Sequence, residues 1–205
     1  MKKLLVTMLS LISISTAYAG DFFGSTHLVG SDIGQANIYG PADLEQVKAS
    51  SLAIHGPLRF KNLEVAQTTH IMGPVLNSQD GKFGTLTIAG PFEAAQVVCQ
   101  GLNVTGPVDV KSLSVQGTTE IIGPLKAEDS HLQNLIIRSD EVTLVNSVVN
   151  NILVKATNNK EQTIYLQRQS VVEGNINFES GRGVVEVKDK SVIHGTVTGG
   201  KIARK

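Results

Sequence analysis

Apolar and polar residues alternate in short runs along most of the chain. Leu52 and Ile54 form one such run, and Leu63 and Val65 form the next, with polar residues between them. A period of two sends successive side chains to opposite faces of a β-strand, whereas an amphipathic helix needs apolar residues three and four positions apart. The pattern therefore predicts very short β-strands, two or three in each repeating unit, joined by corners.

A recurring phrase, apolar-x-Gly-Pro, sets the length of the repeating unit. It occurs six times between residues 38 and 124, and its glycines are 16, 17, 17, 16 and 17 residues apart. A fixed period of this length is typical of repeat proteins in which each unit stacks on the previous one. Glycine gives a corner freedom in φ, and proline fits where the neighbouring coil needs no N–H. The predicted corner residues are Gly40, Pro41, Gly56, Pro57, Gly73, Pro74, Gly90, Pro91, Gly106, Pro107, Gly123 and Pro124.

The sequence also contains a longer repeat of 50 residues. The pattern from Leu52 to Pro74 recurs from Leu102 to Pro124, and every matched position is displaced by 50 residues. Three coils therefore make one larger repeat, which indicates an internal duplication.

These periods predict the fold class. We expect an all-β chain that forms a single-stranded parallel β-helix (β-solenoid) with about 17 residues per coil and roughly ten coils around a dry core of Leu, Ile and Val. At about 4.8 Å per coil, the rod would be roughly 50 Å long. Its two ends would be either capped or used for end-to-end assembly.

The N-terminal segment has the pattern of a secretory signal peptide. Lys2 and Lys3 precede an apolar run from Leu4 to Ile14, and Ala17-Tyr18-Ala19 provides an A-x-A cleavage site. This pattern predicts a signal peptide over residues 1–19 and export to the periplasm, the cell surface or the extracellular space. No apolar run in the chain is long enough to span a bilayer.

The rest of the chain divides into three segments. Residues 20–37 contain no Gly-Pro phrase and are predicted to form an N-terminal cap or first irregular coil. Residues 38–140 are predicted to form the Gly-Pro repeat solenoid, and residues 141–205 the C-terminal solenoid coils and a basic tail that begins at Lys201.

The C-terminal coils have a different sequence repeat. Ser170-Val-Val-x-Gly174-x-Ile-x-Phe178 recurs 21 residues later as Ser191-Val-Ile-x-Gly195-x-Val-x-Gly199. Over residues 170–200 this pattern resembles the bactofilin-like, polymer-forming β-helix proteins of bacteria. The resemblance implies a structural β-helix that polymerises end to end and needs no nucleotide. The Gly-Pro repeat and the signal peptide depart from that family, whose members are chiefly cytoplasmic.

The sequence lacks the common motifs for catalysis, cofactor binding and metal binding. No P-loop, G-x-S-x-G, H-E-x-x-H or cysteine-pair motif is present, so we predict no catalytic, cofactor-binding or metal site. Cys99, the only cysteine, lies in an apolar run and is predicted to be a core residue. The histidines are spread singly and are predicted to lie on the surface; they are His27, His55, His70, His131 and His194.

Two other kinds of lateral surface were considered. Arg59 and Asp109 are equivalent positions of the 50-residue repeat, as are His70 and Glu120. The members of each pair are three coils apart, roughly 14 Å. That distance is too long for general acid-base catalysis by the pair. A flat threonine row suited to ice would need threonine on successive coils. Thr68, Thr69, Thr118 and Thr119 recur only every third coil, and Thr85 and Thr87 add little.

The predicted function follows from an almost unbroken repeat without a catalytic cluster. We expect an exported, non-enzymatic β-solenoid that serves as a structural or protein-interaction module of the bacterial cell envelope or surface and self-associates end to end. The alternative is a carbohydrate-active enzyme or glycan-binding β-helix with a site on a lateral face. Expected partners are a second copy, an envelope or surface protein, or a glycan. A formal net charge of zero gives no basic field for nucleic acid.

Overall fold

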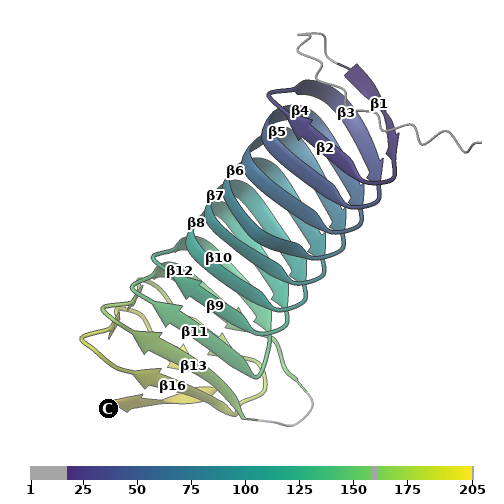
Figure 1. Ribbon diagram of the computed structural model, residues 1–205. Coiled ribbons are helices and arrows are strands. Elements are labelled where there is room, and N and C mark those ends of the chain that lie inside the picture. The colour runs from purple at the N-terminus through teal and green to yellow at the C-terminus, as the bar shows by residue number, and fades with distance from the viewer. Residues whose placement is uncertain (1–17, 158–160, 205) are drawn as a thin grey trace, which may run out of the picture.

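The chain forms one long β-solenoid (Figure 1). The computed structural model describes residues 18–157 and 161–204, and within these residues all regular structure is β-strand. Coils of about 17 residues stack in parallel through about 11 turns, which confirms the predicted fold class. Residues 1–17 of the predicted signal peptide lie outside the described residues, and the division into cap, Gly-Pro repeat and C-terminal coils stays a prediction.

The described residues contain nineteen strands in one parallel ladder. They are β1 (Tyr18–Phe23), β2 (Thr26–Val29), β3 (Asp32–Tyr39), β4 (Ala42–His55), β5 (Leu58–Met72), β6 (Val75–Ala89), β7 (Phe92–Thr105), β8 (Val108–Ile122), β9 (Leu125–Glu128), β10 (His131–Arg138), β11 (Glu141–Val145), β12 (Val148–Val154), β13 (Gln162–Gln167), β14 (Val171–Val172), β15 (Ile176–Phe178), β16 (Gly183–Val187), β17 (Val192–Ile193), β18 (Val197–Thr198) and β19 (Gly200–Arg204).

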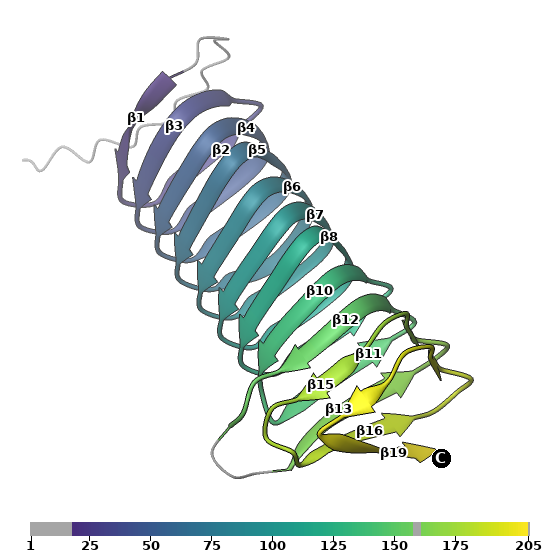
Figure 2. The same cartoon turned by 180° about the vertical axis from the view of Figure 1, so that it is seen from behind.

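Each coil has three sides, separated by two bends and the Gly-Pro corner. In the coil of β4, the first side runs from the corner to the bend at Gln46, and the second side runs from there to a register shift between Ala49 and Leu52. The third side leads from Leu52 to the next Gly-Pro. Figure 2 shows β3 to β8 side by side in one continuous sheet.

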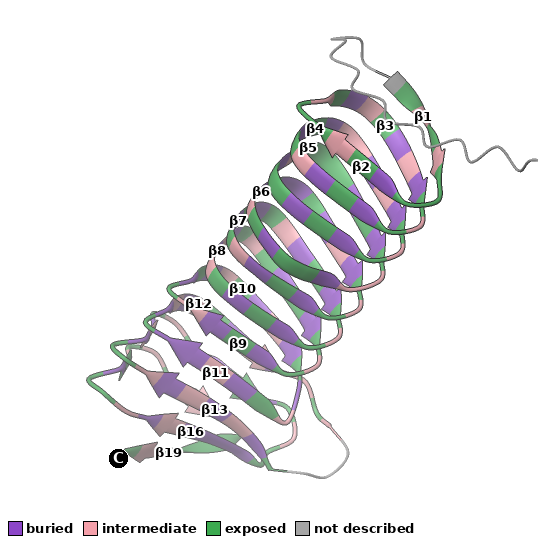
Figure 3. Cartoon of the chain, in the orientation of Figure 1, coloured by how far each residue is buried: buried purple, intermediate pink, exposed green. Residues whose placement is uncertain are grey.

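The core is a set of inward columns, one residue per coil in each. Leu44, Ile54 and Leu86 are at most 1% exposed, whereas their chain neighbours face outward. Buried and exposed residues therefore alternate along each strand (Figure 3). This is the predicted period of two, now wrapped around an apolar interior.

The strands of the Gly-Pro region are longer than expected. β4 to β8 each contain 14 or 15 residues and continue around two bends, instead of dividing into two or three short strands. The backbone ladder survives a bend made by one residue. The strands end at the Gly-Pro corner, where proline has no N–H, although the glycine before it and the residue after it still donate hydrogen bonds to the next coil. The predicted basic tail is also part of the ladder, since β19 pairs with β16.

Candidate functional site

The Gly-Pro corners form one edge of the rod. The N–H of Gly90 donates a hydrogen bond of 2.9 Å to the carbonyl of Thr105 in the next coil, and the carbonyl of Pro91 accepts one of 2.8 Å from Val75. All six glycines on this edge have φ between 136° and 159°. The edge begins one coil earlier, where Gly24 donates to Tyr39 in the same manner.

Close stacking is what requires glycine on this edge. A Cβ on Gly90 would stand 2.5 Å from the carbonyl oxygen of Gly73, and Gly40 has the same relation to Gly24. A Cβ on Gly24, by contrast, would meet nothing within 4 Å. The edge is therefore held by contacts between coils, and each glycine makes room for the coil before it.

A second column, at the bend between the first and second sides, consists of left-handed residues. Their φ values lie between 48° and 59°. Asn and Asp tolerate this conformation best among residues with a Cβ, which explains part of the column. Its members are Gly30, Gln46, Asn62, Asp80, Gln96, Ser112, Asp129, Asn146, Arg168 and Asp189.

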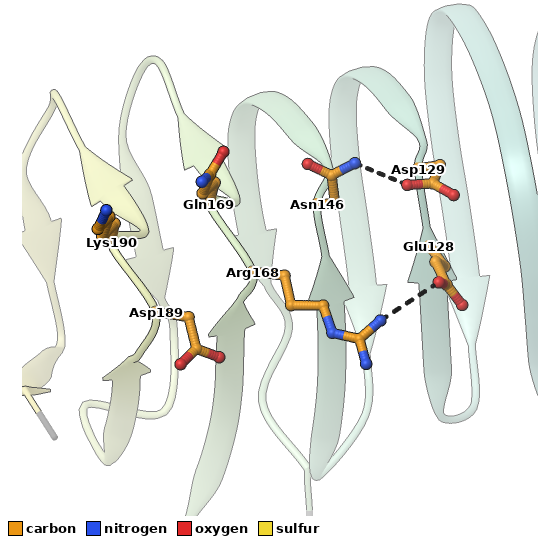
Figure 4. Close-up of a pocket in the computed structure, with 7 residues that line it drawn as sticks. All are labelled: Glu128, Asp129, Asn146, Arg168, Gln169, Asp189 and Lys190. Carbon is orange, nitrogen blue, oxygen red and sulfur yellow. Dashed lines mark hydrogen bonds and ion pairs between the residues drawn. The ribbon is translucent and has the colours of Figure 1, made fainter.

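The C-terminal end of this column contains an open groove of about 560 Å³ (Figure 4). It is lined by Glu128, Asp129, Asn146, Arg168, Gln169, Asp189 and Lys190. Arg168 extends across the coil of Asn146, and its Nη1 lies 3.7 Å from Oε1 of Glu128.

Three charged residues of the groove, Glu128, Asp129 and Arg168, form ion pairs. Nζ of Lys111 lies 3.9 Å from Glu128 and 3.7 Å from Asp129. Asn146 Nδ2 also donates a hydrogen bond of 2.7 Å to Asp129 Oδ1. Together these contacts link four successive coils, those of Lys111, Asp129, Asn146 and Arg168, and brace them against one another.

Buried serines form a third ladder, one or two residues after the left-handed bend. Ser147 N–H donates to Ser170 Oγ over 3.2 Å, and Ser170 N–H donates to Ser191 Oγ over 3.1 Å. Ser130 N–H donates to Ser147 Oγ over 3.0 Å in the same way. These hydroxyls serve as acceptors for backbone N–H groups of the neighbouring coil, in the region where the strands are short.

An aromatic column lies on the outside of the third side, next to the Gly-Pro edge. The rings of Phe23 and Tyr39 are stacked with centroids 5.1 Å apart, and those of Tyr39 and His55 with centroids 4.9 Å apart. Phe23 is 77% exposed. The rings cover one another's faces along the rod axis and present their edges to solvent.

Among the described residues, the pKa values of Glu64, Glu179 and Cys99 are shifted. Hydrogen bonding to Lys82, with the nearby charges of Lys82 and Lys48, lowers the pKa of Glu64. A hydrogen bond from Lys155 likewise lowers the pKa of Glu179. Burial raises the pKa of the Cys99 thiol to about 12, and this side chain is only 1% exposed. The carboxylates belong to surface ion pairs and the thiol is a core group.

Both ends of the solenoid expose residues at inward positions. Ile202 in the last coil is 45% exposed, whereas Val185, its register partner in the preceding coil, is fully buried. Val197 is half-buried above the fully buried Ile176. At the opposite end, Phe22 and Leu28 are only partly covered by the core on which they pack. In the described residues, the strands of the first and last coils pair on one side only.

The residues considered for a carbohydrate site are not brought together. Arg59 pairs in register with Asp43, and Asp109 lies 3.1 Å from Lys126. Among the histidines, His27 lies 3.6 Å from Asp43 and His194 lies 2.7 Å from Glu173. Within the described residues, no group of three or more His, Cys, Asp or Glu side chains could hold a metal ion.

Comparison of the chain with protein-family models, with curated proteins and with solved structures finds no match. The described residues also contain no helix long and apolar enough to cross a membrane. The function therefore has to be inferred from the lateral surfaces and the ends of the rod.

Proposed function

We propose that this chain is an exported, non-enzymatic β-solenoid that serves as a structural or interaction module of the bacterial cell envelope or surface and self-associates end to end. The observation that supports this most is the open last coil, in which Ile202 is 45% exposed at an inward position. An apolar core that ends in solvent beside free strand edges favours continuation by another β-structure.

The register favours joining the last coil of one copy to the first coil of another. β18 and β1 both lie on the third side, and β19 and β2 both lie on the first side. Gly199 occupies the inward column that Phe178 fills one coil earlier. Phe22 lies in the same inward column at the other end of the rod, so joining the two ends would place Phe22 of a second copy next to Gly199.

One feature of the last coil limits the strength of this joint. Arg204 stands in register with the buried Val187 at the end of the core, and Arg204 itself is exposed. Burying a charge without a partner is costly, and a long side chain has to turn outward to reach water. The proposed association is therefore reversible and depends on protein concentration.

Sedimentation velocity on residues 20–205 over a range of concentrations tests the proposal. The unmodified protein is expected to form larger species as concentration rises, and Ile202→Lys is expected to shift that transition to higher concentration. Val98→Lys is a matched control, because Val98 is 41% exposed on a lateral surface. Equal behaviour of the two variants would refute a joint at the last coil.

A further inference from the structure

One side of the rod is free of formal charge over five successive coils. Between residues 33 and 119 there are eleven Asp, Glu, Lys and Arg residues, and all of them lie on the first and second sides; they are Asp43, Glu45, Lys48, Arg59, Lys61, Glu64, Asp80, Lys82, Glu93, Asp109 and Lys111. The third side of these coils, made of residues 35–39, 51–55, 68–72, 85–89 and 101–105, contains none. We call it the uncharged face.

The uncharged face has three outward columns of different chemistry. The first consists of Gln35, Ser51, Thr68, Thr85 and Gly101, the second of Asn37, Ala53, His70, Thr87 and Asn103, and the third of Tyr39, His55, Met72, Ala89 and Thr105. The third column is the apolar one. Met72 is 62% exposed and Tyr39 is 41% exposed, and the same column continues to Phe23 and Ile122 at its ends.

We propose that the uncharged face binds the same face of a second copy of this chain, with the two rods antiparallel. Contact between the five coils of this face buries no Asp, Glu, Lys or Arg side chain, and its two histidines, His55 and His70, can be buried in their neutral form. The other two sides would bury charges of both signs. Side chains on the face repeat at about 4.8 Å along the rod, and a second copy offers an identical repeat. The proposal concerns a side of the rod, so it goes beyond the end-to-end assembly and can fail independently of it.

An antiparallel arrangement is self-complementary. A two-fold axis perpendicular to the rod, passing between the coils of β5 and β6, places the apolar column against the apolar column and hydroxyls against hydroxyls. Met72 then faces Ala89, a large residue against a small one, and His70 faces Thr87. One coil further out, His55 faces Thr105. The first charged residue reached, Glu120, faces the amide of Asn37, which donates a hydrogen bond of 2.8 Å to Asp21 Oδ1, so this coil forms the rim of the pair.

The size of the face sets the expected strength. The five coils of the face and the adjoining coil of Glu120, at about 4.8 Å per coil, and five residues at about 3.3 Å give a footprint of roughly 29 Å by 17 Å. Two such footprints amount to roughly 1,000 Å², below the size of standard specific interfaces and in the range of weak, transient ones. The pair is therefore reversible and requires micromolar or higher protein concentrations.

Cross-linking tests the register of the pair. Residues 20–205 carrying Ile202→Lys, which weakens the proposed end joint, are made in two versions, His70→Cys and Thr87→Cys, and mixed under mild oxidation. The buried Cys99 thiol stays unreactive. We expect a disulfide-linked 70–87 dimer. The control pair is Val98→Cys mixed with Ser114→Cys, which are also register neighbours in adjacent coils but lie on the second side. A 70–87 yield no greater than the control yield would overturn the proposal.

Sedimentation equilibrium gives a second, independent test. Thr87→Lys is expected to weaken the dimer at least about tenfold, because its ammonium group would be buried in the pair. Ser114→Lys should leave the dimer unchanged, and circular dichroism establishes that both variants are folded. An unchanged dimer in Thr87→Lys would contradict the proposal. So would a monomer that binds insoluble cellulose through this face, because the face would then serve a neutral glycan. Each substitution is also made alone. If Thr87→Lys shifts the size distribution and Ile202→Lys does not, the lateral pair is supported and the end joint is refuted.

Discussion

The carbonyl oxygen of Gly73 lies 2.5 Å from the point that a Cβ of Gly90 would occupy. The two residues are consecutive members of the Gly-Pro edge, and the same relation recurs along it. The period of 16 or 17 residues that is visible in the sequence is thus the spacing at which one backbone packs directly on the next.

Replacing Gly90 with alanine should therefore be costly. The added methyl group meets the backbone of the preceding coil, which cannot move without disturbing the ladder, and φ at this position is 152°. We expect the free energy of unfolding to fall by about 2 to 4 kcal/mol, measured by urea denaturation. In Gly101→Ala the nearest atoms are 3.9 Å from the new Cβ, so that variant should lose little or nothing. Equal losses in the two variants would show that close stacking does not fix the edge.

The serine ladder supports the shorter strands of the C-terminal coils. Ser170→Ala removes the acceptor of the Ser147 N–H and leaves a buried donor without a partner. An orphaned buried group of this kind costs about 1 to 3 kcal/mol. Ser114→Ala, on the outer surface, is the control and should change the unfolding midpoint little. A loss in Ser170→Ala as small as that of the control would mean that the ladder contributes no net stability.

Cys99 should be inert in the folded protein. Its pKa is raised to about 12 by burial, so little thiolate forms at pH 8, and its neighbours in register are the core residues Phe83 and Val115. A thiol reagent at pH 8 should label Val98→Cys within minutes and Cys99 only after unfolding. Because the folded pKa is raised from 9.0, the stability linked to this thiol is complete below pH 9 and is lost as the pH rises toward 12. Rapid labelling of native Cys99 would contradict its place in the core.

The export hypothesis predicts a defined mature N-terminus. Full-length protein produced in a bacterium should be recovered from the periplasm or medium with Gly20 as its first residue, as measured by intact mass. Substituting leucine for both Ala17 and Ala19 removes the small residues of the cleavage site and should leave the precursor uncut. Recovery of unprocessed wild-type chain from the cytoplasm would refute the signal peptide.

The sequence predicts the coil architecture because its strongest signals are backbone requirements. Glycine and proline mark the corner directly, and aliphatic residues at a period of two mark the core. The left-handed bend is harder to predict from the sequence, because residues as different as Gln46, Asn62, Ser112 and Arg168 adopt the same conformation. Only the Asn and Asp members carry a local preference for it.

The register between coils decides which of two neighbouring residues is buried, and the sequence pattern alone does not give that register. Thr68 and Thr69 are adjacent in the chain, yet Thr69 is fully buried and Thr68 is exposed beside Thr85. The uncharged face has a signal in the sequence, because the charged residues between 33 and 119 cluster after each Gly-Pro phrase. That signal becomes visible only when the coils are aligned by their Gly-Pro corners. The exposed core residues of the last coil, by contrast, have no recognisable signal in the sequence.

Negative-stain electron microscopy of residues 20–205 tests the central claim most directly. One chain of about 11 coils is a rod of roughly 53 Å at about 4.8 Å per coil. End-to-end association predicts rods whose lengths are multiples of that value and whose mean length rises with protein concentration and falls in Ile202→Lys. Rods of single length at every concentration would contradict the account.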